Sequence, residues 1–418
     1  MKILIETPEM TISIPYLLST EIKLPASKSI SNRALVIRAL AGVDASLDNI
    51  SECDDSNVVV EALHTMPYEI DIKAAGTAMR FLTSLLATMP AEHVITGTER
   101  MRNRPIGVLV KALQTIGADI TYVDKEGFPP LRIKGGTLSG GHLCLPGNVS
   151  SQYISSLLMI APTLHSGLSL ELTGEIISRP YIDMTLEIMK QFGADANWET
   201  DNIIYVAPQP YKPTPYYIEN DWSAASYWYE IVALSSNENL TIVLPGLFKE
   251  SLQGDSAVAQ FFASLGVETI FEDNKVCLRK TKIRAGEFVK DMVNQPDLAQ
   301  TMVVTCCMLG IPFNISGLQT LRIKETDRIA ALQKELLKLG YVIKADGDDS
   351  MSWNGEKIEE IADIDVIGID TYDDHRMAMA FAPVALTRAS IVINNPEVVS
   401  KSYPNFWQDL KKCGFKLD

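Results

Sequence analysis

A repeat of about 74 residues constrains the fold of this chain more than any other feature of its sequence. Five times an amphipathic helix pattern ends in an apolar residue, a glycine follows, and a short strand pattern begins. Glycine is expected at the end of a helix, because it adopts a left-handed backbone there at little cost. The spacings are 76, 73, 74 and 74 residues, and the glycines are Gly117, Gly193, Gly266, Gly340 and Gly414. A unit of this size predicts a complete βα subdomain rather than a solenoid repeat.

Each repeat also holds a second helix pattern that is apolar on all sides, which predicts a buried helix. These patterns begin at Gly76, Ser150, Asp221, Asp297 and Asp374. A sixth such helix opens at Ser29, only 47 residues before Gly76. Between these two helices, the pattern SNVVVEALHTM runs directly into Met66-Pro67 and a strand pattern, without the glycine. We therefore predict that the first repeat lacks about 23 residues, corresponding to a surface hairpin.

Six repeats predict an α/β (α+β) fold with two similar domains of three repeats each. In each domain, three buried helices are covered by sheets of short β-branched strands such as VITGT, LSLEL and IVINN. We expect the two domains to face one another across a cleft. The seam is placed at Tyr217–Asp221, and the first strands, Ile3 to about Lys23, are assigned to the second set of repeats. One domain then comprises residues 1–24 plus 219–418, and the other residues 25–218.

The composition is that of a soluble globular protein, with 46% hydrophobic and 21% charged residues among 418. A net charge of -15 argues against nucleic acid as a partner and gives weight to any local cluster of Lys and Arg. The longest uncharged stretch, Gln300–Thr320, is broken by glycine and proline, which argues against a membrane span. The first ten residues lack the apolar core of a signal peptide, so we expect a cytoplasmic protein. The cysteines show no metal-ligand spacing, and the pair Cys306-Cys307 is expected in the core.

The segment LPASKSISNRAL places Lys28 and Arg33 around the start of the opening helix. Unpaired amides, hydroxyls and positive charge at a helix start favour an anion, most plausibly a phosphate. The alternative is a serine-capped helix with solvated charges. Two other buried helices open in a similar way, with Gly76-Thr77 and with Ser150-Ser151-Gln152. Three similar starts in equivalent repeats favour the phosphate interpretation.

The buried helices of the last three repeats open with acids instead. Asp221 and Asp374 are interpreted as N-caps, the usual role of aspartate at a helix start. Asp297 is a candidate general base, because Asn294 or Gln295 is placed to cap its helix and would leave the carboxylate to face a ligand.

Three further clusters concentrate charge. The segment RIKETDRIAAL lies at a helix start, where it indicates either a site or a solvated helix end with i,i+3 pairs. His375 and Arg376 directly precede an apolar helix, where a charged pair is hard to explain as surface decoration. In the segment RMRNRPIG the arginines alternate, which predicts an extended stretch with Arg100, Arg102 and Arg104 on one side. Lys401 is isolated, and the sequence around it favours solvent exposure.

Several of these segments resemble the 5-enolpyruvylshikimate-3-phosphate synthase family, in the same order and along nearly the whole chain. They are LPASKSISNRAL, AAGTAMR, RMRNRPIG, NVSSQ, SRPYIDMTL, RIKETDR, DDHRMAMA and SKSYPNF. The resemblance implies a two-domain inside-out α/β barrel of six βαβαββ repeats, here with a truncated first repeat. It also implies transfer of the enolpyruvyl group of phosphoenolpyruvate to the 5-hydroxyl of shikimate 3-phosphate, by addition and then elimination of phosphate. We accordingly expect a cytoplasmic monomer of the shikimate pathway that needs no metal or organic cofactor and is a target of glyphosate.

The resemblance assigns roles to individual residues. Shikimate 3-phosphate would be bound by Lys28, Ser29, Arg33, Ser150, Ser151, Gln152, Ser178, Tyr181, Asp297, Thr320 and Lys324. Phosphoenolpyruvate would be bound by Lys28, Gly76, Arg104, Gln152, Arg328, Arg376 and Lys401. Arginine suits both anionic groups of phosphoenolpyruvate because its guanidinium fork binds carboxylate and phosphate bidentately. Asp297 would accept the 5-hydroxyl proton and Glu325 would exchange a proton with the methylene carbon, with Lys28 and His375 completing the catalytic group.

The chain departs from the family pattern at three positions. Ala74 stands where the family usually has Asn, Thr320 stands where an Asn often contacts shikimate 3-phosphate, and Ala26 stands in the opening turn where Gly is common. None of these changes removes an acid, a base or an anchoring arginine.

Three alternatives remain in view. The enolpyruvyl transferase that acts on UDP-N-acetylglucosamine shares fold and donor, but it carries a Cys in the loop corresponding to RMRNRP, which this chain lacks. RNA 3'-phosphate cyclase shares the repeat type, and the acidic charge argues against it. The third alternative, of another class, is an inactive relative that serves as a binding module. The retained charged residues of the site argue against this last alternative.

Overall fold

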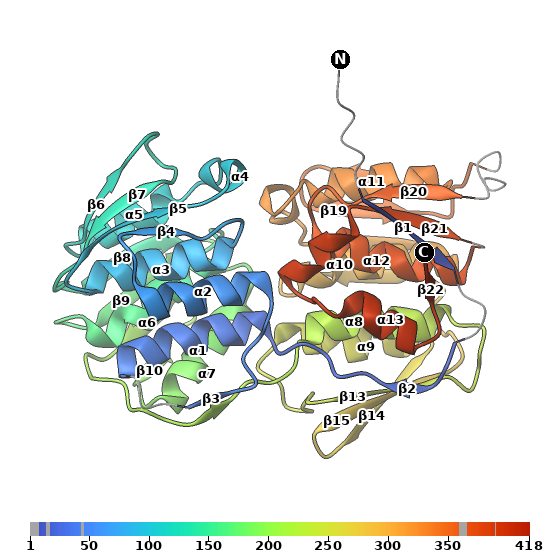
Figure 1. Ribbon diagram of the computed structural model, residues 1–418, viewed down its shortest axis with the longest axis horizontal. Coiled ribbons are helices and arrows are strands. Elements are labelled where there is room, and N and C mark those ends of the chain that lie inside the picture. Colours follow the sequence, from blue (N-terminus) through green and yellow to red (C-terminus); the bar gives the residue numbers. More distant parts are fainter. Residues whose placement is uncertain (1–7, 14–16, 43–45, 359–365, 389) are drawn as a thin grey trace. The chain divides into compact units, whose positions relative to one another are not determined.

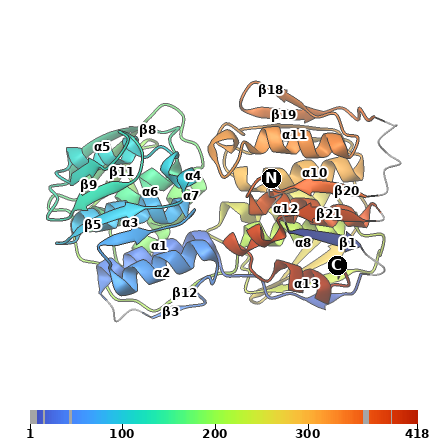
Figure 2. The same cartoon turned by 45° about the horizontal axis from the view of Figure 1, so that its top comes forward.

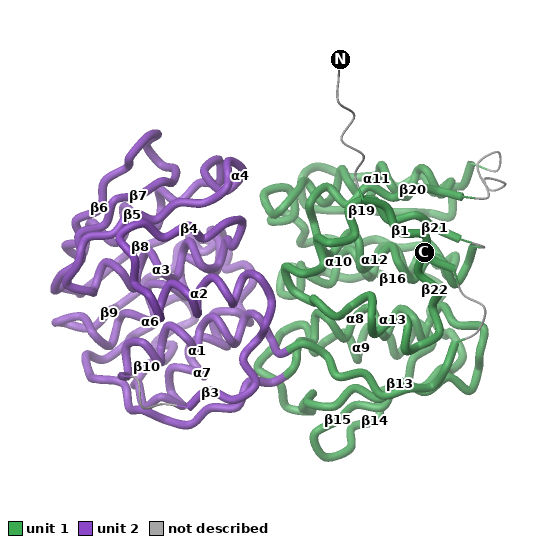
Figure 3. The backbone as a smooth tube through the Cα atoms, in the orientation of Figure 1, with its two compact units in different colours: residues 1–25, 220–418 green, residues 26–219 purple. Residues whose placement is uncertain are grey.

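The computed structural model describes residues 8–13, 17–42, 46–358, 366–388 and 390–418. The chain forms two compact units, residues 1–25 with 220–418 (unit 1) and residues 26–219 (unit 2) (Figure 3). The predicted N-terminal strand region, Ile3 to about Lys23, is described only in part, since residues 3–7 and 14–16 lie outside the described ranges.

Unit 2 is built around three helices that contact one another, α1, α3 and α6 (Figure 1). Amphipathic helices α2, α5 and α7 pack against them from outside. The helices of unit 2 are α1 (Lys28–Ala41), α2 (Asp54–Thr65), α3 (Gly76–Thr88), α4 (Glu99–Arg102), α5 (Gly107–Thr115), α6 (Ser151–Ile160) and α7 (Arg179–Gln191). Its strands are β3 (Leu47–Asp48), β4 (Glu69–Asp71), β5 (Glu92–Thr96), β6 (Asp119–Tyr122), β7 (Leu131–Lys134), β8 (Gly141–Pro146), β9 (Leu168–Thr173), β10 (Ala196–Trp198), β11 (Ile203–Val206) and β12 (Tyr216–Tyr217).

Unit 1 repeats this plan, with α10 in contact with both α8 and α12 (Figures 1 and 2). Its helices are α8 (Trp222–Leu234), α9 (Val258–Ser264), α10 (Ala299–Leu309), α11 (Arg328–Lys338), α12 (His375–Phe381) and α13 (Phe406–Lys412). Its strands are β1 (Glu9–Ser13), β2 (Thr20–Glu21), β13 (Thr241–Pro245), β14 (Val267–Glu272), β15 (Lys275–Lys280), β16 (Phe288–Asp291), β17 (Phe313–Ser316), β18 (Lys344–Asp346), β19 (Ser350–Trp353), β20 (Ile367–Asp370), β21 (Ile391–Asn394) and β22 (Lys416–Leu417).

The sheets of the described residues follow a common plan, which one of them has only in part. Five of them have four strands, in which a parallel pair is extended by two antiparallel strands. The strand orders are β20-β21-β1-β22, β2-β13-β15-β14, β16-β17-β19-β18, β4-β5-β7-β6 and β8-β9-β11-β10. The sixth sheet has only the parallel pair β12-β3. The mixed α/β class predicted from the sequence is confirmed.

The periodic glycines follow helices and precede strands, as predicted. All five have a positive φ, between 83° and 107°, which a residue with a side chain adopts only with strain. Helix α2 is the exception, because it ends at Met66 with a φ of 41° and an αL backbone. Strand β4 begins three residues later, at Glu69.

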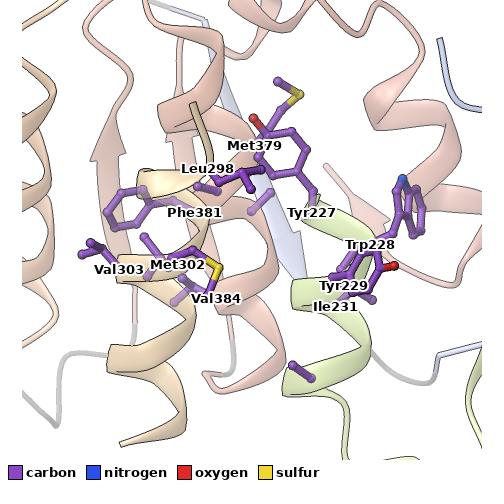
Figure 4. Packing of buried hydrophobic residues seen from close by; sticks show 14 of the residues in the cluster. Tyr227, Trp228, Tyr229, Ile231, Leu298, Met302, Val303, Met379, Phe381 and Val384 are labelled. Atoms are coloured by element: carbon purple, nitrogen blue, oxygen red, sulfur yellow. The ribbon is translucent and has the colours of Figure 1, made fainter. Parts of the chain in front are cut away.

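The core of unit 1 combines aromatic side chains of α8 with mostly aliphatic side chains of α10 and α12, to which α12 adds Phe381 (Figure 4). Tyr227, Trp228 and Tyr229 of α8 are at most 1% exposed. Cys306 and Cys307 of α10 are fully buried, which confirms their predicted place in the core. Among the described helices, none has the length and apolar character that crossing a membrane would require.

Glu230 is an acid within this apolar centre, on α8 and 0% exposed. Burial raises the pKa of Glu230 well above its usual value, and neither of its carboxylate oxygens has a hydrogen-bond partner among the described residues. An acid with a raised pKa in the folded protein stabilises the fold fully below its unfolded pKa. That stability is lost as the pH rises toward the folded pKa.

We therefore expect Glu230→Gln to stabilise the protein increasingly as the pH rises from about 5 to 8, by up to about 1.4 kcal/mol per pH unit. Urea unfolding of both proteins across this range measures the difference. Glu335→Gln is the matched control, because Glu335 is also 0% exposed but lies 2.6 Å from Lys338 Nζ, and breaking that pair should cost stability. A pH-independent difference for Glu230→Gln would contradict the expectation.

Candidate active site

Lys28 is held at the start of α1 by an acid from the start of α2. Its Nζ lies 3.3 Å from Asp55 Oδ2, and the two side chains are 15% and 5% exposed. Ser27 caps α1, since its Oγ accepts from Ile30 N at 3.4 Å. Lys28 is therefore an oriented, partly buried charge and not a solvated one. Asp55 was not predicted as a partner of Lys28, because the two residues are 27 positions apart in the sequence.

Arg33 lies one turn after Ser29 and is almost fully buried, at 2% exposure. Its Nε donates to Thr185 Oγ1 at 2.7 Å and its Nη1 to Ser29 O at 2.9 Å. Its Nη2 donates to Ser155 Oγ at 3.1 Å and to Tyr181 O at 3.2 Å. Burial lowers the pKa of Arg33 to about 10, so it stays charged at neutral pH. Four of its five N–H donors thus join α1, α6 and α7, which leaves one for a ligand.

The starts of α3 and α6 are connected by Gln152, whose Nε2 donates to Thr77 Oγ1 at 3.1 Å. Ser150 is the N-cap of α6 and accepts from Gln152 N at 3.4 Å, so its hydroxyl has the structural role that the sequence left open. Ser151 is the first residue of α6. Ser178 is the N-cap of α7, with a left-handed φ of 54° and 6% exposure.

The RMRNRPIG segment is not extended, so the predicted alternation of its arginines is wrong. Residues Glu99–Arg102 form the short helix α4, capped by Thr98, because the Thr98 hydroxyl and a buried Met101 favour a helical turn here. Arg100 and Arg102 are exposed, whereas Arg104 is partly buried. A Cβ placed on Gly76 would lie 2.6 Å from Arg104 Nη1. Gly76 and Arg104, both predicted to bind phosphoenolpyruvate, therefore meet in unit 2.

In unit 1, Asp297 lies among three cations. Its Oδ2 is 3.0 Å from Arg376 Nη2, and its Oδ1 is 3.1 Å from Arg328 Nη1 and 3.6 Å from Lys324 Nζ. Asp297 lies in the 3-10 turn before α10, and Gln295 makes no side-chain cap there. The capping by Gln295 considered from the sequence is thus not what frees the carboxylate.

Arg328, 1% exposed, binds three carboxylates at once. Its Nε lies 2.7 Å from Asp374 Oδ2, and its Nη2 and Nη1 reach Glu325 at 2.9 Å and Asp297 at 3.1 Å. Burial lowers the pKa of Arg328, but the three carboxylates outweigh it and raise the pKa above its usual value. Asp374 also accepts from Arg376 N at 3.0 Å, which confirms its N-cap role. Asp221 likewise caps α8 by accepting from Ser223 N at 2.7 Å.

Lys401 and His375 complete the cluster. Lys401 Nζ lies 3.1 Å from Glu325 Oε1 and its side chain is 13% exposed, so the exposure favoured from the sequence is wrong. His375 is 1% exposed, with Nδ1 3.8 Å from Asp374 Oδ1. Thr320 precedes the turn Leu321–Ile323, and the described residues offer no hydrogen-bond partner to its buried hydroxyl.

The charges of this cluster shift the pKa values of the acids within and beside it. Burial raises the pKa of Asp297, but Arg376, Lys324 and Arg328 outweigh burial and hold the pKa well below its usual value. Asp255, which the sequence did not single out, is 3% exposed and accepts a short hydrogen bond from Ser223 Oγ. Burial, reinforced by the charge of Asp297, raises the pKa of Asp255 to about 7.

This cluster suits acid–base chemistry on an anionic substrate. Among the described residues, Asp297 and Glu325 contact Lys324, Arg328, Arg376 and Lys401, and guanidinium groups can bind carboxylate or phosphate bidentately. Within the described part of the chain, no group of three or more His, Cys, Asp and Glu residues could hold a metal ion.

Comparisons with known proteins agree along the chain. The sequence model of the family EPSP synthase (3-phosphoshikimate 1-carboxyvinyltransferase) matches residues 12–72 and 65–410. The two matched segments overlap over residues 65–72, which run from the end of α2 through β4. A 3-phosphoshikimate 1-carboxyvinyltransferase of Bacteroides fragilis (strain YCH46) is 55% identical over 406 residues, covering 97% of this chain and 98% of that protein. One of Vibrio campbellii is 36% identical over 419 residues, covering 94% and 96%.

A solved structure shares the fold. EPSP synthase from Acinetobacter baumannii superposes with a TM-score of 0.79 at 20% identity, covering 98% of this chain and 100% of that one.

Proposed function

The chain belongs to the EPSP synthase family, and from this membership we infer that it transfers the enolpyruvyl group of phosphoenolpyruvate to the 5-hydroxyl of shikimate 3-phosphate, releasing phosphate. The observation that supports this inference at the level of residues is a largely buried ionic cluster, in which Asp297 contacts Arg328 of the RIKETDR motif and Arg376 of the DDHRMAMA motif. The enzyme acts as a monomer in the cytoplasm.

Phosphate release tests this function. Purified protein is incubated with phosphoenolpyruvate and either shikimate 3-phosphate or UDP-N-acetylglucosamine as acceptor. We expect release with shikimate 3-phosphate alone. Absence of release with that acceptor would overturn the proposal, and release only with UDP-N-acetylglucosamine would assign the chain to the other enolpyruvyl transferase.

Shikimate 3-phosphate is assigned to helix starts of unit 2 and to polar groups of unit 1. In unit 2 the assigned residues are Lys28, Ser29, Arg33, Ser150, Ser151, Gln152, Ser178 and Tyr181. In unit 1 they are Asp297, Thr320 and Lys324. The Ser150 and Ser178 hydroxyls lie at the starts of α6 and α7, where helix amides favour a phosphate. The Thr320 hydroxyl is buried without a hydrogen-bond partner in the described part of the chain, which supports its place among them.

Phosphoenolpyruvate is assigned to the cations. Unit 2 supplies Gly76, Arg104 and, shared between both substrates, Lys28 and Gln152. Unit 1 supplies Arg328, Arg376 and Lys401. The meeting of Gly76 with Arg104 supports this assignment, since the missing side chain leaves room for the guanidinium.

The reaction proceeds by addition and elimination. The 5-hydroxyl oxygen bonds to C2 of phosphoenolpyruvate while Asp297 takes the hydroxyl proton and Glu325 protonates C3, which gives a tetrahedral ketal phosphate. Loss of a C3 proton to Glu325 and departure of phosphate then restore the double bond, and the proton held by Asp297 leaves with the phosphate, which returns both acids to their starting states. His375 and Lys28 support these steps through charge, and Lys28 also orients the substrates.

Substrate binding prepares Asp297 for its role as a base. Arg376 and Arg328 hold the pKa of Asp297 low. When the carboxylate and phosphate of phosphoenolpyruvate bind these arginines, their negative charge offsets the stabilisation of the Asp297 carboxylate. Its pKa then rises, and it becomes a stronger base only when the donor substrate is present.

The fold is an inside-out α/β barrel of six βαβαββ repeats whose first repeat lacks its hairpin. Five sheets with one topology and a sixth reduced to its parallel pair support this interpretation. The αL residue Met66, in the place where the other repeats have glycine, and the overlap of the two matched segments there support it further.

We expect Gly76→Ala to raise the KM for phosphoenolpyruvate about tenfold. The new methyl would lie 2.6 Å from Arg104 Nη1, and overpacking of about 1–3 kcal/mol corresponds to roughly tenfold per 1.4 kcal/mol. Gly136→Ala is the control, because a Cβ there meets nothing within 4 Å. Steady-state kinetics in which each substrate is varied in turn give the two KM values. An equal rise in both of them would count against the assignment of Gly76 and Arg104 to phosphoenolpyruvate.

A further inference from the structure

Tyr153 of α6 joins the two substrate-binding parts of unit 2. It directly follows Gln152, and its side chain is 7% exposed. Its phenol Oη donates to Pro105 O over 2.5 Å. Pro105 follows Arg104, so the helix whose start is assigned to shikimate 3-phosphate is bonded to the loop assigned to phosphoenolpyruvate.

Arg80 of α3 supports the same contact. Its Nη2 donates to Pro105 O at 3.3 Å and its Nη1 to Gly76 O at 3.0 Å. Its guanidinium carbon lies 5.8 Å from the centre of the Tyr153 ring. The Pro105 carbonyl therefore accepts two hydrogen bonds, and one of the donors also holds the backbone of Gly76, against which Arg104 packs.

The loop before Pro105 is anchored by its backbone. Met101 is 1% exposed, and Arg104 N donates to Met101 O at 3.0 Å. On the other side, Ile106 is 0% exposed and its N donates to Gly127 O at 2.9 Å. The Pro105 carbonyl lies between these anchors and directly follows Arg104 in sequence. A hydrogen bond to this carbonyl therefore fixes the backbone beside Arg104 and with it the direction of the Arg104 side chain.

We propose that Tyr153 is a positioning residue for Arg104, holding the Pro105 carbonyl so that the guanidinium lies over Gly76 in the orientation that binds phosphoenolpyruvate. The inference rests on the proposed function. Tyr153 touches no reacting atom and acts through Arg104. Because α6 also carries Ser150, Ser151 and Gln152, the phenol couples the shikimate 3-phosphate helix to the arginine of the donor site.

The variant Tyr153→Phe removes only the hydroxyl and keeps the ring beside Arg80. We expect its KM for phosphoenolpyruvate to rise about threefold to tenfold, the effect of one neutral hydrogen bond. The KM for shikimate 3-phosphate and kcat should stay within about twofold of the wild type, since Arg104 is assigned to the donor substrate and remains present.

Tyr211→Phe is the matched control. Tyr211 belongs to the same unit, is 4% exposed, and donates to another backbone carbonyl, Met159 O, at 2.8 Å. Both variants lose one buried phenol–carbonyl bond, so their melting temperatures should match, and both KM values of Tyr211→Phe should equal those of the wild type. A Tyr153→Phe protein that melts well below Tyr211→Phe and raises both KM values together would show a merely structural role and overturn the proposal.

A double-mutant cycle with Arg104→Met tests whether Tyr153 acts through Arg104. If it does, Tyr153→Phe has no further effect on the KM for phosphoenolpyruvate in the Arg104→Met background. Additive effects would overturn the proposal, as would an unchanged KM in the single variant. A wild-type protein that releases no phosphate from the two substrates would instead overturn the proposed function, and this inference with it.

Discussion

Asp297→Asn is expected to lower kcat by about 10²–10⁴ while still binding phosphoenolpyruvate. The fall in kcat is the range typical for loss of a general base. The substitution keeps the size of the side chain and removes the negative charge that Arg328, Arg376 and Lys324 share at 3.1, 3.0 and 3.6 Å. Those three cations are then less neutralised, so affinity for an unreactive phosphoenolpyruvate analogue should be unchanged or higher. Steady-state kinetics and calorimetric titration with the analogue measure the two effects.

The pH profile of the wild type gives the same prediction a second readout. The cations hold the pKa of Asp297 well below its usual value, so the basic form is present in the free enzyme down to acidic pH. The acidic limb of kcat/KM, which reports free groups, should therefore lie at lower pH than the acidic limb of kcat, which reports groups with substrates bound.

Asp291→Asn is the control for this substitution. Asp291 belongs to the same repeat and accepts from Val293 N at 2.9 Å, a bond that an asparagine oxygen can replace. Its activity should equal that of the wild type. Turnover of Asp297→Asn within about twofold of the wild type would remove Asp297 from the mechanism.

The secondary structure and the class of the fold were predictable because they depend on local patterns. Glycine is required wherever a helix ends in a left-handed turn, and that need recurs at Gly117, Gly193, Gly266, Gly340 and Gly414, all with positive φ. Helices that are apolar on every side predicted the buried centres of both units. The alternating arginines led to the wrong prediction of an extended segment. Three arginines at alternate positions do not by themselves specify a strand, and the Thr98 cap starts a short helix there.

The partners within the site were not predictable, because they are distant in sequence. Lys28 meets Asp55 across 27 positions, and Arg328 meets Asp374 across 46. Asp374 was predicted as an N-cap, which it is, yet the same carboxylate also binds Arg328. A motif indicates which residue types gather at a helix start. Only the packing of several helices decides which carboxylate neutralises which cation.

Arg328→Met is expected to destabilise unit 1 by about 3–5 kcal/mol and to abolish turnover. The side chain is 1% exposed and its guanidinium binds Asp374, Glu325 and Asp297, at 0%, 14% and 17% exposure. Methionine fills a similar volume but leaves three carboxylates without this cation, and an uncompensated buried charge has a cost of that order. Urea unfolding measures the loss of stability, and phosphate release measures the loss of turnover.

Arg322→Met is the control for removing an arginine of the same segment. Arg322 binds Asp327 and Asp348 at 2.9 Å each, with side chains 28%, 39% and 86% exposed, so solvent screening limits the expected loss to about 0–1 kcal/mol. The loss of stability in Arg328→Lys should lie between those of Arg328→Met and Arg322→Met. An ammonium keeps the positive charge, but it lacks the planar guanidinium that binds three carboxylates at once.

A second substitution, Asp374→Asn, distinguishes two causes of the lower stability of Arg328→Met: the lost ionic attraction and the carboxylate that is left buried without its cation. Asp374 is 0% exposed and lies 2.7 Å from Arg328 Nε. In Arg328→Met, the loss of this partner should therefore cost more free energy at Asp374 than at the two more exposed acids. An asparagine can still cap α12 through its side-chain oxygen. Adding Asp374→Asn to Arg328→Met should therefore recover part of the lost stability, even though it removes a second ionic partner. If the double variant is less stable than Arg328→Met, the cost lies in packing rather than in an unpaired carboxylate, and the electrostatic account of Arg328 is wrong.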